Sequence, residues 1–398
     1  MLSKFKFSIF RWIFGLTLFL GCQEPPQQED QSLDPMEFHQ AITTIDSHID
    51  FNVDYFTDTL NYTHELDIKV DLPKMERGGL DVAWLVVYTA QGDLTDEGYA
   101  AALENANAKF DAIDRLVNQY ASDRIALATN SREMDSIIQI GKKVAMIGVE
   151  NAYSIGLDTS NIRKFHERGA RYLSLSHNGH NQLSDSQTGD QDGIYLHNGI
   201  SDLGRQVIEL CNYYGIMLDL SHPSEESIRQ TIKHSKAPVI ASHSSARALS
   251  PNSRNLPDEL LELIKDNGGV VQAVALHYFV DKEKRERFTS ARDSILAIDP
   301  NTDIESIKVQ FPPVDVADYI DHIDYLVEKM GIDHVGISSD FDGGGEIEGW
   351  NDASETHNIT IELLERGYSE EEIKKIWGGN LMRVLDEVQE ISRSLQSL

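Results

Sequence analysis

Short runs of apolar and β-branched residues alternate with longer amphipathic stretches along most of this chain. Eight such runs, bounded by polar or turn-forming residues, predict β-strands. They span residues 41–46, 80–89, 143–150, 170–176, 215–221, 237–242, 268–276 and 334–340. The amphipathic stretches between them predict helices, the clearest being residues 101–121, 202–214 and 316–330.

Eight strand–helix repeats in one chain predict an α/β fold of the (β/α)8 barrel type. Residues 36–398 form one predicted domain, longer than the ~250 residues of a typical barrel, so we expect long active-site loops and extra C-terminal helices. A doubly wound open sheet is the alternative. It is disfavoured because no Gly-rich nucleotide-binding fingerprint follows the first predicted strand.

Residues 1–22 have the pattern of an export signal. Basic residues precede the uncharged run WIFGLTLFLG, which is too short for the ~20-residue helix that spans a bilayer. Cys22 follows this run at once, an arrangement that resembles the lipobox of bacterial lipoproteins, although Phe19 stands where Leu is usual. The polar residues 23–35 then predict a tether. We expect an exported cell-envelope lipoprotein held at a bacterial membrane by a lipid on Cys22, with a secreted protein or an uncleaved N-terminal anchor as the alternatives.

The formal net charge of -30 argues against nucleic acid as a partner, because phosphate backbones attract basic surfaces. A negative field of this kind favours the binding of cations. Apart from Cys22 the chain has a single cysteine, Cys211. We therefore expect no structural disulfide, and predict that Cys211 is a small buried side chain.

Imidazole or carboxylate groups follow seven of the eight predicted strands. They are His48 and Asp50 after the first strand, Glu150 after the third, His177, His222, His243 and His277 after the fourth to the seventh, and Asp340 after the eighth. In an extended backbone residues i and i+2 share a face, so His48 and Asp50 should converge on one point. The carboxyl ends of barrel strands meet at one rim, where active sites form. We therefore expect these side chains to lie together.

Zinc is the cofactor that this set of side chains predicts, because imidazole and carboxylate are ligands that zinc accepts. The candidates exceed the needs of one catalytic zinc, which indicates two ions bridged by a carboxylate and a water. Glu150 is the natural bridge, since its strand lies between those of the other candidates. The sequence has neither an H-E-x-x-H helix nor a G-x-S-x-G elbow, which disfavours a thermolysin-like protease and a serine hydrolase.

Six segments between about residues 42 and 345 resemble the membrane dipeptidase family, the metal-dependent hydrolases that include renal dipeptidase and its bacterial relatives. These segments are IDSHIDF, VEN, RYLSLSHNGHN, GIMLDLSHPS, PVIASHSSARALSPNSRNLPDELL and HVGISSDFDG. The resemblance implies a (β/α)8 barrel that hydrolyses dipeptides with two zinc ions and a metal-bridged hydroxide. It implies the following roles: His48 and Asp50 bind one zinc, His222 and His243 bind the other, Glu150 bridges them, His177 and Arg254 bind substrate, His177 also stabilises the oxyanion, and Asp340 carries the proton.

The sequence departs from the family pattern at several positions. LHYFV replaces the family's Asn-Phe-Tyr, so we expect His277 and Tyr278 in a substrate-facing region, and Leu183 replaces a Trp. The paired cysteines of the animal members are absent, and both a monomer and a homodimer are compatible with the sequence. Two other functions stay open: a different metal-dependent amidohydrolase, acting on a β-lactam, an acyl-amino acid or a cyclic amide, and a catalytically inactive envelope lipoprotein that only binds.

Overall fold

The computed structural model describes residues 34–397. The predicted export signal, Cys22 and nearly all of the predicted tether lie outside the described residues. Within the described part, the first helix begins at Pro35. None of the described helices is both long and apolar enough to cross a membrane.

The described strands form one sheet in which every pair is parallel and the main path follows chain order. The strands are β1 (Ile45–Ile49), β2 (Val82–Tyr88), β3 (Ile125–Leu127), β4 (Lys143–Glu150), β5 (Ala170–Ser174), β6 (Met217–Asp219), β7 (Val239–Ala241), β8 (Val270–Val274) and β9 (Val335–Ser338). The two ends of this path meet, because the Asp50 amide donates to the Phe341 carbonyl at 2.9 Å. The predicted (β/α)8 barrel is confirmed, and the open doubly wound alternative is wrong.

Two details of the strands differ from the sequence-based prediction. The first strand was expected at residues 41–46, but it begins at Ile45, because the chain is helical up to Ala41. His48 therefore lies inside β1 and not after it. The short strand β3 was not predicted, because three residues that pair only with β4 are too few to show a periodic pattern.

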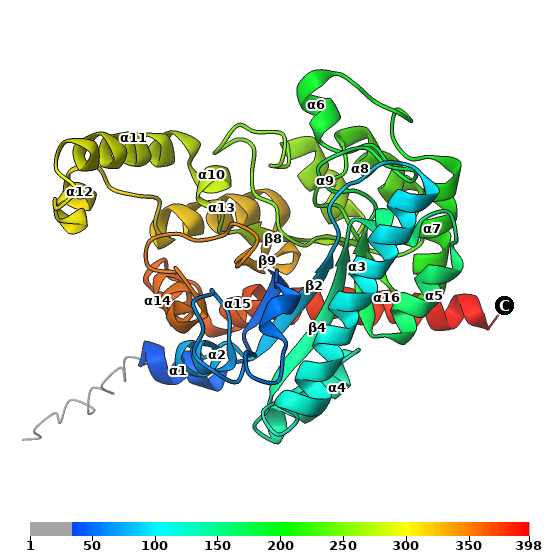
Figure 1. Cartoon of the computed structure of the whole chain (residues 1–398), viewed down its shortest axis with the longest axis horizontal. Helices are drawn as coiled ribbons and strands as arrows, with labels where there is room; N and C mark the ends of the chain where they lie inside the picture. Colours follow the sequence, from blue (N-terminus) through cyan, green and yellow to red (C-terminus); the bar gives the residue numbers. More distant parts are fainter. Residues whose placement is uncertain (1–33, 398) are drawn as a thin grey trace, which may run out of the picture. The chain divides into compact units, whose positions relative to one another are not determined.

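Helices surround the strands in Figure 1. They are α1 (Pro35–Ala41), α2 (Leu72–Gly78), α3 (Asp96–Arg115), α4 (Ser131–Gln139), α5 (Ser160–Glu167), α6 (Thr188–Asp192), α7 (Asp202–Tyr214), α8 (Glu225–His234), α9 (Asp258–Asp266), α10 (His277–Val280), α11 (Lys282–Ile298), α12 (Ile304–Gln310), α13 (Val316–Met330), α14 (His357–Glu365), α15 (Glu370–Lys374) and α16 (Asn380–Gln396). The bounds of α7 and α13 match the predicted helices. The helix predicted at 101–121 begins earlier, because the Thr95 side chain caps it by accepting from the Gly98 amide.

The C-terminal helix α16 lies across the amino ends of the barrel strands. Asn380 donates to the carbonyl of Val335, the first residue of β9, at 2.8 Å. Leu385 of α16 belongs to the same buried apolar cluster as Trp84 of β2. Figure 1 shows α16 passing behind the strands. Because α16 covers the amino ends, the carboxyl ends are the rim that stays available for a site.

Cys211 is free and fully buried in α7, which confirms the sequence-based prediction for this residue. Leu183, which stands where the resembling family has Trp, is also fully buried. Both are core residues.

Candidate metal centre and active site

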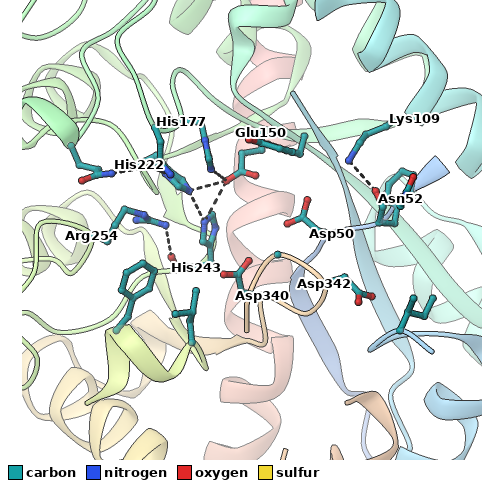
Figure 2. Close-up of a pocket in the computed structure, with 18 of the residues that line it drawn as sticks. Asp50, Asn52, Lys109, Glu150, His177, His222, His243, Arg254, Asp340 and Asp342 are labelled. Atoms are coloured by element: carbon teal, nitrogen blue, oxygen red, sulfur yellow. Dashed lines mark hydrogen bonds and ion pairs between the residues drawn. The ribbon is translucent and has the colours of Figure 1, made fainter. Parts of the chain in front are cut away.

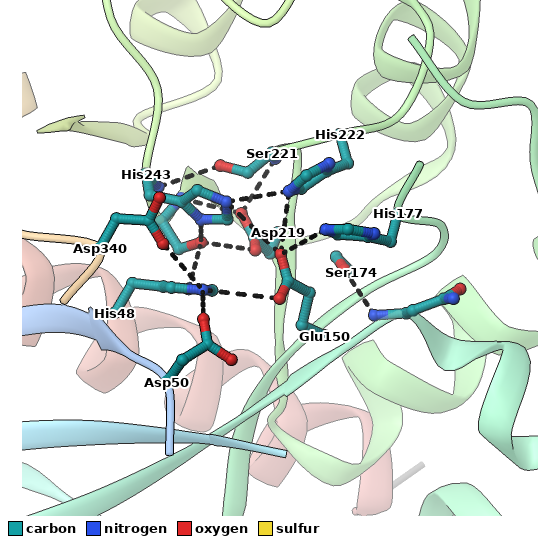
Figure 3. A network of polar contacts seen from close by, with 12 residues as sticks. His48, Asp50, Glu150, Ser174, His177, Asp219, Ser221, His222, His243 and Asp340 are labelled. Atoms are coloured by element: carbon teal, nitrogen blue, oxygen red, sulfur yellow. Dashed lines mark hydrogen bonds and ion pairs between the residues drawn. The ribbon is translucent and has the colours of Figure 1, made fainter. Parts of the chain in front are cut away.

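The structure brings together the eight residues to which the family resemblance gives roles, but not His277 and Tyr278. Seven of them line one cavity of about 810 Å³ at the carboxyl ends of the strands: Asp50, Glu150, His177, His222, His243, Arg254 and Asp340. His48 lies behind the cavity wall and is 1% exposed. Figure 2 shows the cavity, and Figure 3 shows the polar contacts within it.

Glu150 lies at the centre of this group. It ends β4 on the same face as Val144 and Met146, which point into the barrel, because side chains alternate along a strand. One carboxylate oxygen, Oε2, is 3.6 Å from His48 Nε2. The other, Oε1, is 2.9 Å from His222 Nε2 and 3.4 Å from His243 Nε2. Oε2 of Glu150 thus faces His48, whereas Oε1 faces His222 and His243 (Figure 3).

His48 occupies one side of Glu150 with two further carboxylates. Its Nε2 is 3.6 Å from Asp50 Oδ2 and 3.9 Å from Asp340 Oδ1. This buried nitrogen has no hydrogen-bond partner among the described residues. Ligand atoms that each lie ~2.0–2.2 Å from one zinc are separated by roughly 3 to 4 Å. The spacing around His48 Nε2 therefore fits a shared cation better than direct hydrogen bonds.

His222 and His243 occupy the other side of Glu150, and their Nε2 atoms lie 3.0 Å apart. His177 approaches from the same side, with its Nε2 3.9 Å from Glu150 Oε1. Three clusters of ligand type result, and Glu150 belongs to two of them. They are His48 with Glu150 and His243, Glu150 with His177 and His222, and His48 with Asp50 and Asp340.

The hydrogen bond at Nδ1 of each ring determines the protonation of Nε2, the nitrogen that faces Glu150. His48 Nδ1 is 3.0 Å from the Tyr172 hydroxyl, which donates its own proton to the Ser47 carbonyl. His222 Nδ1 is 3.1 Å from the amide oxygen of Asn178. In each case Nδ1 must supply the proton, so Nε2 presents a lone pair towards Glu150.

The same holds for His243. Its Nδ1 is 2.8 Å from the Ser242 hydroxyl, which donates to the buried carboxylate of Asp219 at 2.6 Å. Three imidazole lone pairs therefore converge on one carboxylate, an arrangement with acceptors and no proton donor. This group of acceptors needs a cation between them. Metal-binding histidines in general have their second ring nitrogen hydrogen-bonded to a neighbouring group, as these three have.

Burial and neighbouring charges shift the pKa values in the site. Burial lowers the pKa of His222 and that of His243 well below the usual value, so both rings are neutral, as metal ligands must be. Burial also opposes protonation of His48, but the carboxylates of Glu150 and Asp50 outweigh it and raise the pKa of His48 well above normal. Without a cation His48 would thus carry a proton on Nε2, and a metal ion bound there would replace that proton and leave the Nε2 lone pair as a ligand.

Asp340 differs from the other carboxylates. Burial raises its pKa to about 8, and although His48 opposes this shift, Asp50 adds to it. A carboxyl group with such a pKa can hold a proton near neutral pH, as a general acid requires. The glycines after Asp340 allow the backbone to pass close to the two carboxylates. A Cβ atom on Gly343 would lie 2.5 Å from Asp340 Oδ1 and 2.4 Å from Asp50 Oδ2.

Four residues at the rim adopt left-handed backbone conformations that are unfavourable for residues other than glycine. They are Asn151 with φ 70°, His222 with φ 80°, and Asp340 and Asp342, each with φ 59°. Each such residue costs on the order of 1–3 kcal/mol, and they tend to collect at functional sites. The strain lies beside the Glu150 carboxylate and at two of the predicted site residues.

Arg254 also lines the cavity, and Figure 2 shows it beyond His243 from Asp50. Its guanidinium donates to the His243 carbonyl at 3.2 Å and lies over the ring of Phe279. Arg254 is only 7% exposed, yet within the described chain no carboxylate forms an ion pair with it. A buried guanidinium without an anion is suited to binding one from a ligand.

The expectation that His277 and Tyr278 face the substrate is wrong. Leu276 and Phe279 line the cavity instead. The physical reason is that α10 begins at His277. From this residue on, successive side chains are rotated by about 100° around the helix axis, whereas in a strand they would alternate between two faces. His277 Nε2 accepts from Arg285 Nε at 3.4 Å, away from the cavity.

Several residues of the site were missed from the sequence. Tyr172 lies within β5 and contacts His48 Nδ1, whereas Asp219 ends β6 and supports His243 through the Ser242 hydroxyl. Lys109 lines the cavity from the middle of α3. The sequence did contain a signal for Lys109, because it falls on the apolar stripe formed by Ala106, Phe110 and Ile113, where a charge is unexpected.

Residues 35–398 match the family model described as membrane dipeptidase, peptidase family M19. The chain is 31% identical over 359 residues to dipeptidase tcpJ of Claviceps purpurea. This alignment covers 89% of this chain and 76% of that protein. It is also 31% identical over 370 residues to dipeptidase verJ of Clonostachys rogersoniana, covering 89% and 86% of the two chains. The crystal structure of the probable dipeptidase PvdM from Pseudomonas aeruginosa is similar with a TM-score of 0.78 at 31% identity, over 90% of this chain and 98% of that one.

Proposed function

Because the chain belongs to the membrane dipeptidase family, peptidase family M19, and is a metal-dependent dipeptide hydrolase, we propose that it works with two zinc ions. In this proposal His48 and Asp50 would hold one ion, His222 and His243 would hold the other, and Glu150 would serve both. The observation that carries the proposal is the orientation of Glu150, whose Oε2 faces His48 beside Asp50 and whose Oε1 faces His222 and His243. A single ion would leave one of these sets without a cation.

Divalent ions bound at these ligands would polarise the scissile carbonyl and lower the pKa of a water towards neutrality. The protein's own residues supply the rest of the proposed mechanism. Arg254 binds the free carboxylate of the dipeptide and fixes the orientation of the peptide bond. His177, on the Glu150 side of the cavity, donates a hydrogen bond to the oxygen on which negative charge develops. Asp340 passes a proton to the leaving amine.

The experiment that tests this function combines metal analysis with a substrate panel. Purified protein should contain close to two zinc ions per chain and should hydrolyse dipeptides. Removal of the ions by a chelator should abolish turnover, and zinc should restore it. A β-lactam, N-acyl-amino acids and a cyclic amide belong in the same panel. Turnover of these compounds with negligible dipeptide hydrolysis would favour another amidohydrolase, and no turnover of any compound would favour a binding protein.

We further propose that the protein is a lipoprotein of a bacterial cell envelope, held by a lipid on Cys22. Support for this comes from the sequence alone: the basic start, the short apolar run, the cysteine directly after it and the polar residues that follow. The polar residues 23–35 would give the barrel a short spacer from the membrane surface.

A further inference from the structure

Lys109 of α3 is an unusual lining residue of the cavity. It is 8% exposed, and its Nζ donates to the Phe51 carbonyl at 3.1 Å. The same Nζ lies 4.8 Å from the centre of the Phe51 ring and 5.5 Å from that of Tyr88. No carboxylate among residues 34–397 forms an ion pair with it. Lysine is almost never buried unless it is paired, so this position needs an explanation.

A second buried lysine in the same protein shows what structural pairing looks like. Lys74 is 5% exposed, and its Nζ is 2.6 Å from Asp71 Oδ2 and 2.7 Å from the Leu66 carbonyl. Lys74 therefore has a carboxylate and a carbonyl, whereas Lys109 has a single carbonyl for its three N–H groups. The ammonium group of Lys109 has donors to spare, and they border an open cavity.

Lys109 and Arg254 lie at positions that suit the two opposite ends of a substrate. Figure 2 shows the two side chains on opposite sides of Glu150 and Asp50. On the proposed function, the dipeptide's free carboxylate lies at Arg254 and its peptide bond lies at the ligands. The N-terminal residue then extends towards Lys109, between the rings of Phe51 and Tyr88.

We infer that Lys109 is a specificity residue that selects dipeptides with an acidic N-terminal residue, Asp or Glu. The aromatic rings beside Lys109 suit the methylene groups of such a side chain, and the ammonium group suits its carboxylate. The substrate's own α-ammonium group has a carboxylate partner nearby, because Asp342 lines the same cavity. This inference rests on the proposed function, since Arg254 sets the direction of the dipeptide.

The test measures kcat/KM for Glu-Gly, Gln-Gly and Leu-Gly with the full-length, zinc-loaded enzyme. Gln is the neutral isostere of Glu, so the ratio of Glu-Gly to Gln-Gly isolates the charge. The wild type should prefer Glu-Gly by at least tenfold. A hydrogen bond between charged groups corresponds to about 10- to 100-fold, so Lys109→Met should lower this ratio by that factor, and Lys109→Arg should restore part of it.

Lys265→Met is the matched control, because Lys265 is exposed on α9, and it should leave the ratio at the wild-type value. Unfolding temperature and zinc content of each variant show whether the protein is intact. Equal losses for all three dipeptides in Lys109→Met would mean that Lys109 only supports the structure, and would overturn the inference. A wild type without preference for Glu-Gly would also overturn it. A wild type that hydrolyses no dipeptide would overturn the proposed function itself.

Discussion

Gly148 of β4 lies against the ring of Tyr172 in β5, so closely that a Cβ atom on Gly148 would be 2.0 Å from Tyr172 Cζ. This contact links the barrel interior to the site, because the Tyr172 hydroxyl is the group that holds His48 Nδ1. The absence of a side chain at residue 148 is thus a condition for the orientation of a predicted zinc ligand.

Gly148→Ala should therefore reduce both stability and metal binding. Overpacking of a buried site typically costs about 1–3 kcal/mol, which denaturant unfolding can measure. Displacement of Tyr172 should also weaken zinc affinity by about 10- to 100-fold, the usual effect of losing a group that positions a ligand. Tyr172→Phe separates the two effects, because it keeps the ring and should lower zinc affinity with a smaller loss of stability. Unfolding free energy within 0.5 kcal/mol of wild type in Gly148→Ala would contradict the prediction.

The number of ions can be tested by removing ligands one at a time. His243→Ala should lose most of one zinc ion and nearly all turnover, whereas Glu150→Gln should weaken the binding of both ions, because Glu150 faces both sets of ligands. Elemental analysis of the purified variants gives the stoichiometry. His64→Ala is the control, since His64 is exposed and belongs to none of the ligand clusters, and it should keep both ions. A wild type with at most one ion, and no gain in activity on adding zinc, would refute two ions.

The sequence predicted the barrel and the group of site residues for one physical reason. Parallel strands bring their carboxyl ends to a common rim, so polar residues that follow separate strands meet there whatever the lengths of the helices between them. His48, Glu150 and His243 are far apart in the chain and adjacent in the structure for this reason. The same rule failed for His277, because it does not tell at which residue a helix begins.

Residues that act from within strands or helices could not be assigned from the sequence. Asp219 and Tyr172 resemble ordinary strand residues, and their role depends on which ring lies above them after folding. The space for Tyr172 comes from Gly148 on the neighbouring strand, a pairing that the register sets and the sequence does not display. Lys109 was visible as a charge on an apolar helix face, but its lack of a carboxylate partner became evident only in the structure.

Arg254 should distinguish a free C-terminal carboxylate from a neutral one. The wild type is expected to hydrolyse Leu-Gly much faster than Leu-Gly amide, because the amide cannot accept a charge-assisted pair of hydrogen bonds. Arg254→Met should lower kcat/KM for Leu-Gly by about 10- to 100-fold and so reduce the difference between the two substrates. Arg254→Lys keeps the charge without the planar fork and should give an intermediate value. Equal losses for both substrates would indicate that Arg254 does not contact the carboxylate.

The predicted anchor depends on one side chain. Cys22→Ser removes the thiol to which a lipid would be attached, so the variant should be exported without taking up labelled fatty acid. It should also leave the membrane fraction, since residues 23–35 are polar. Fractionation of wild type and variant, with fatty-acid labelling, provides the measurement. A variant that stays with the membranes, together with a wild type that carries no lipid, would instead favour an uncleaved N-terminal anchor.

Asp340 should separate proton transfer from metal binding. Its carboxylate is 3.9 Å from His48 Nε2, farther than those of Asp50 and Glu150, and its pKa is raised to about 8. Asp340→Asn keeps the size of the side chain and removes its titration. Asparagine also tolerates the left-handed backbone that residue 340 adopts, so the loop should keep its conformation.

General acid–base catalysis typically contributes about 10²- to 10⁴-fold, so turnover of Asp340→Asn should fall by that factor while zinc content stays near two ions per chain. Asp123→Asn, which changes an exposed carboxylate outside the cavity lining in the same way, is the control and should keep turnover near the wild-type value. Turnover above half the wild-type value in Asp340→Asn would exclude Asp340 as the proton carrier. Loss of an ion would make Asp340 a ligand, as its cluster with His48 and Asp50 allows, and His177 would then be the next residue to test for proton transfer.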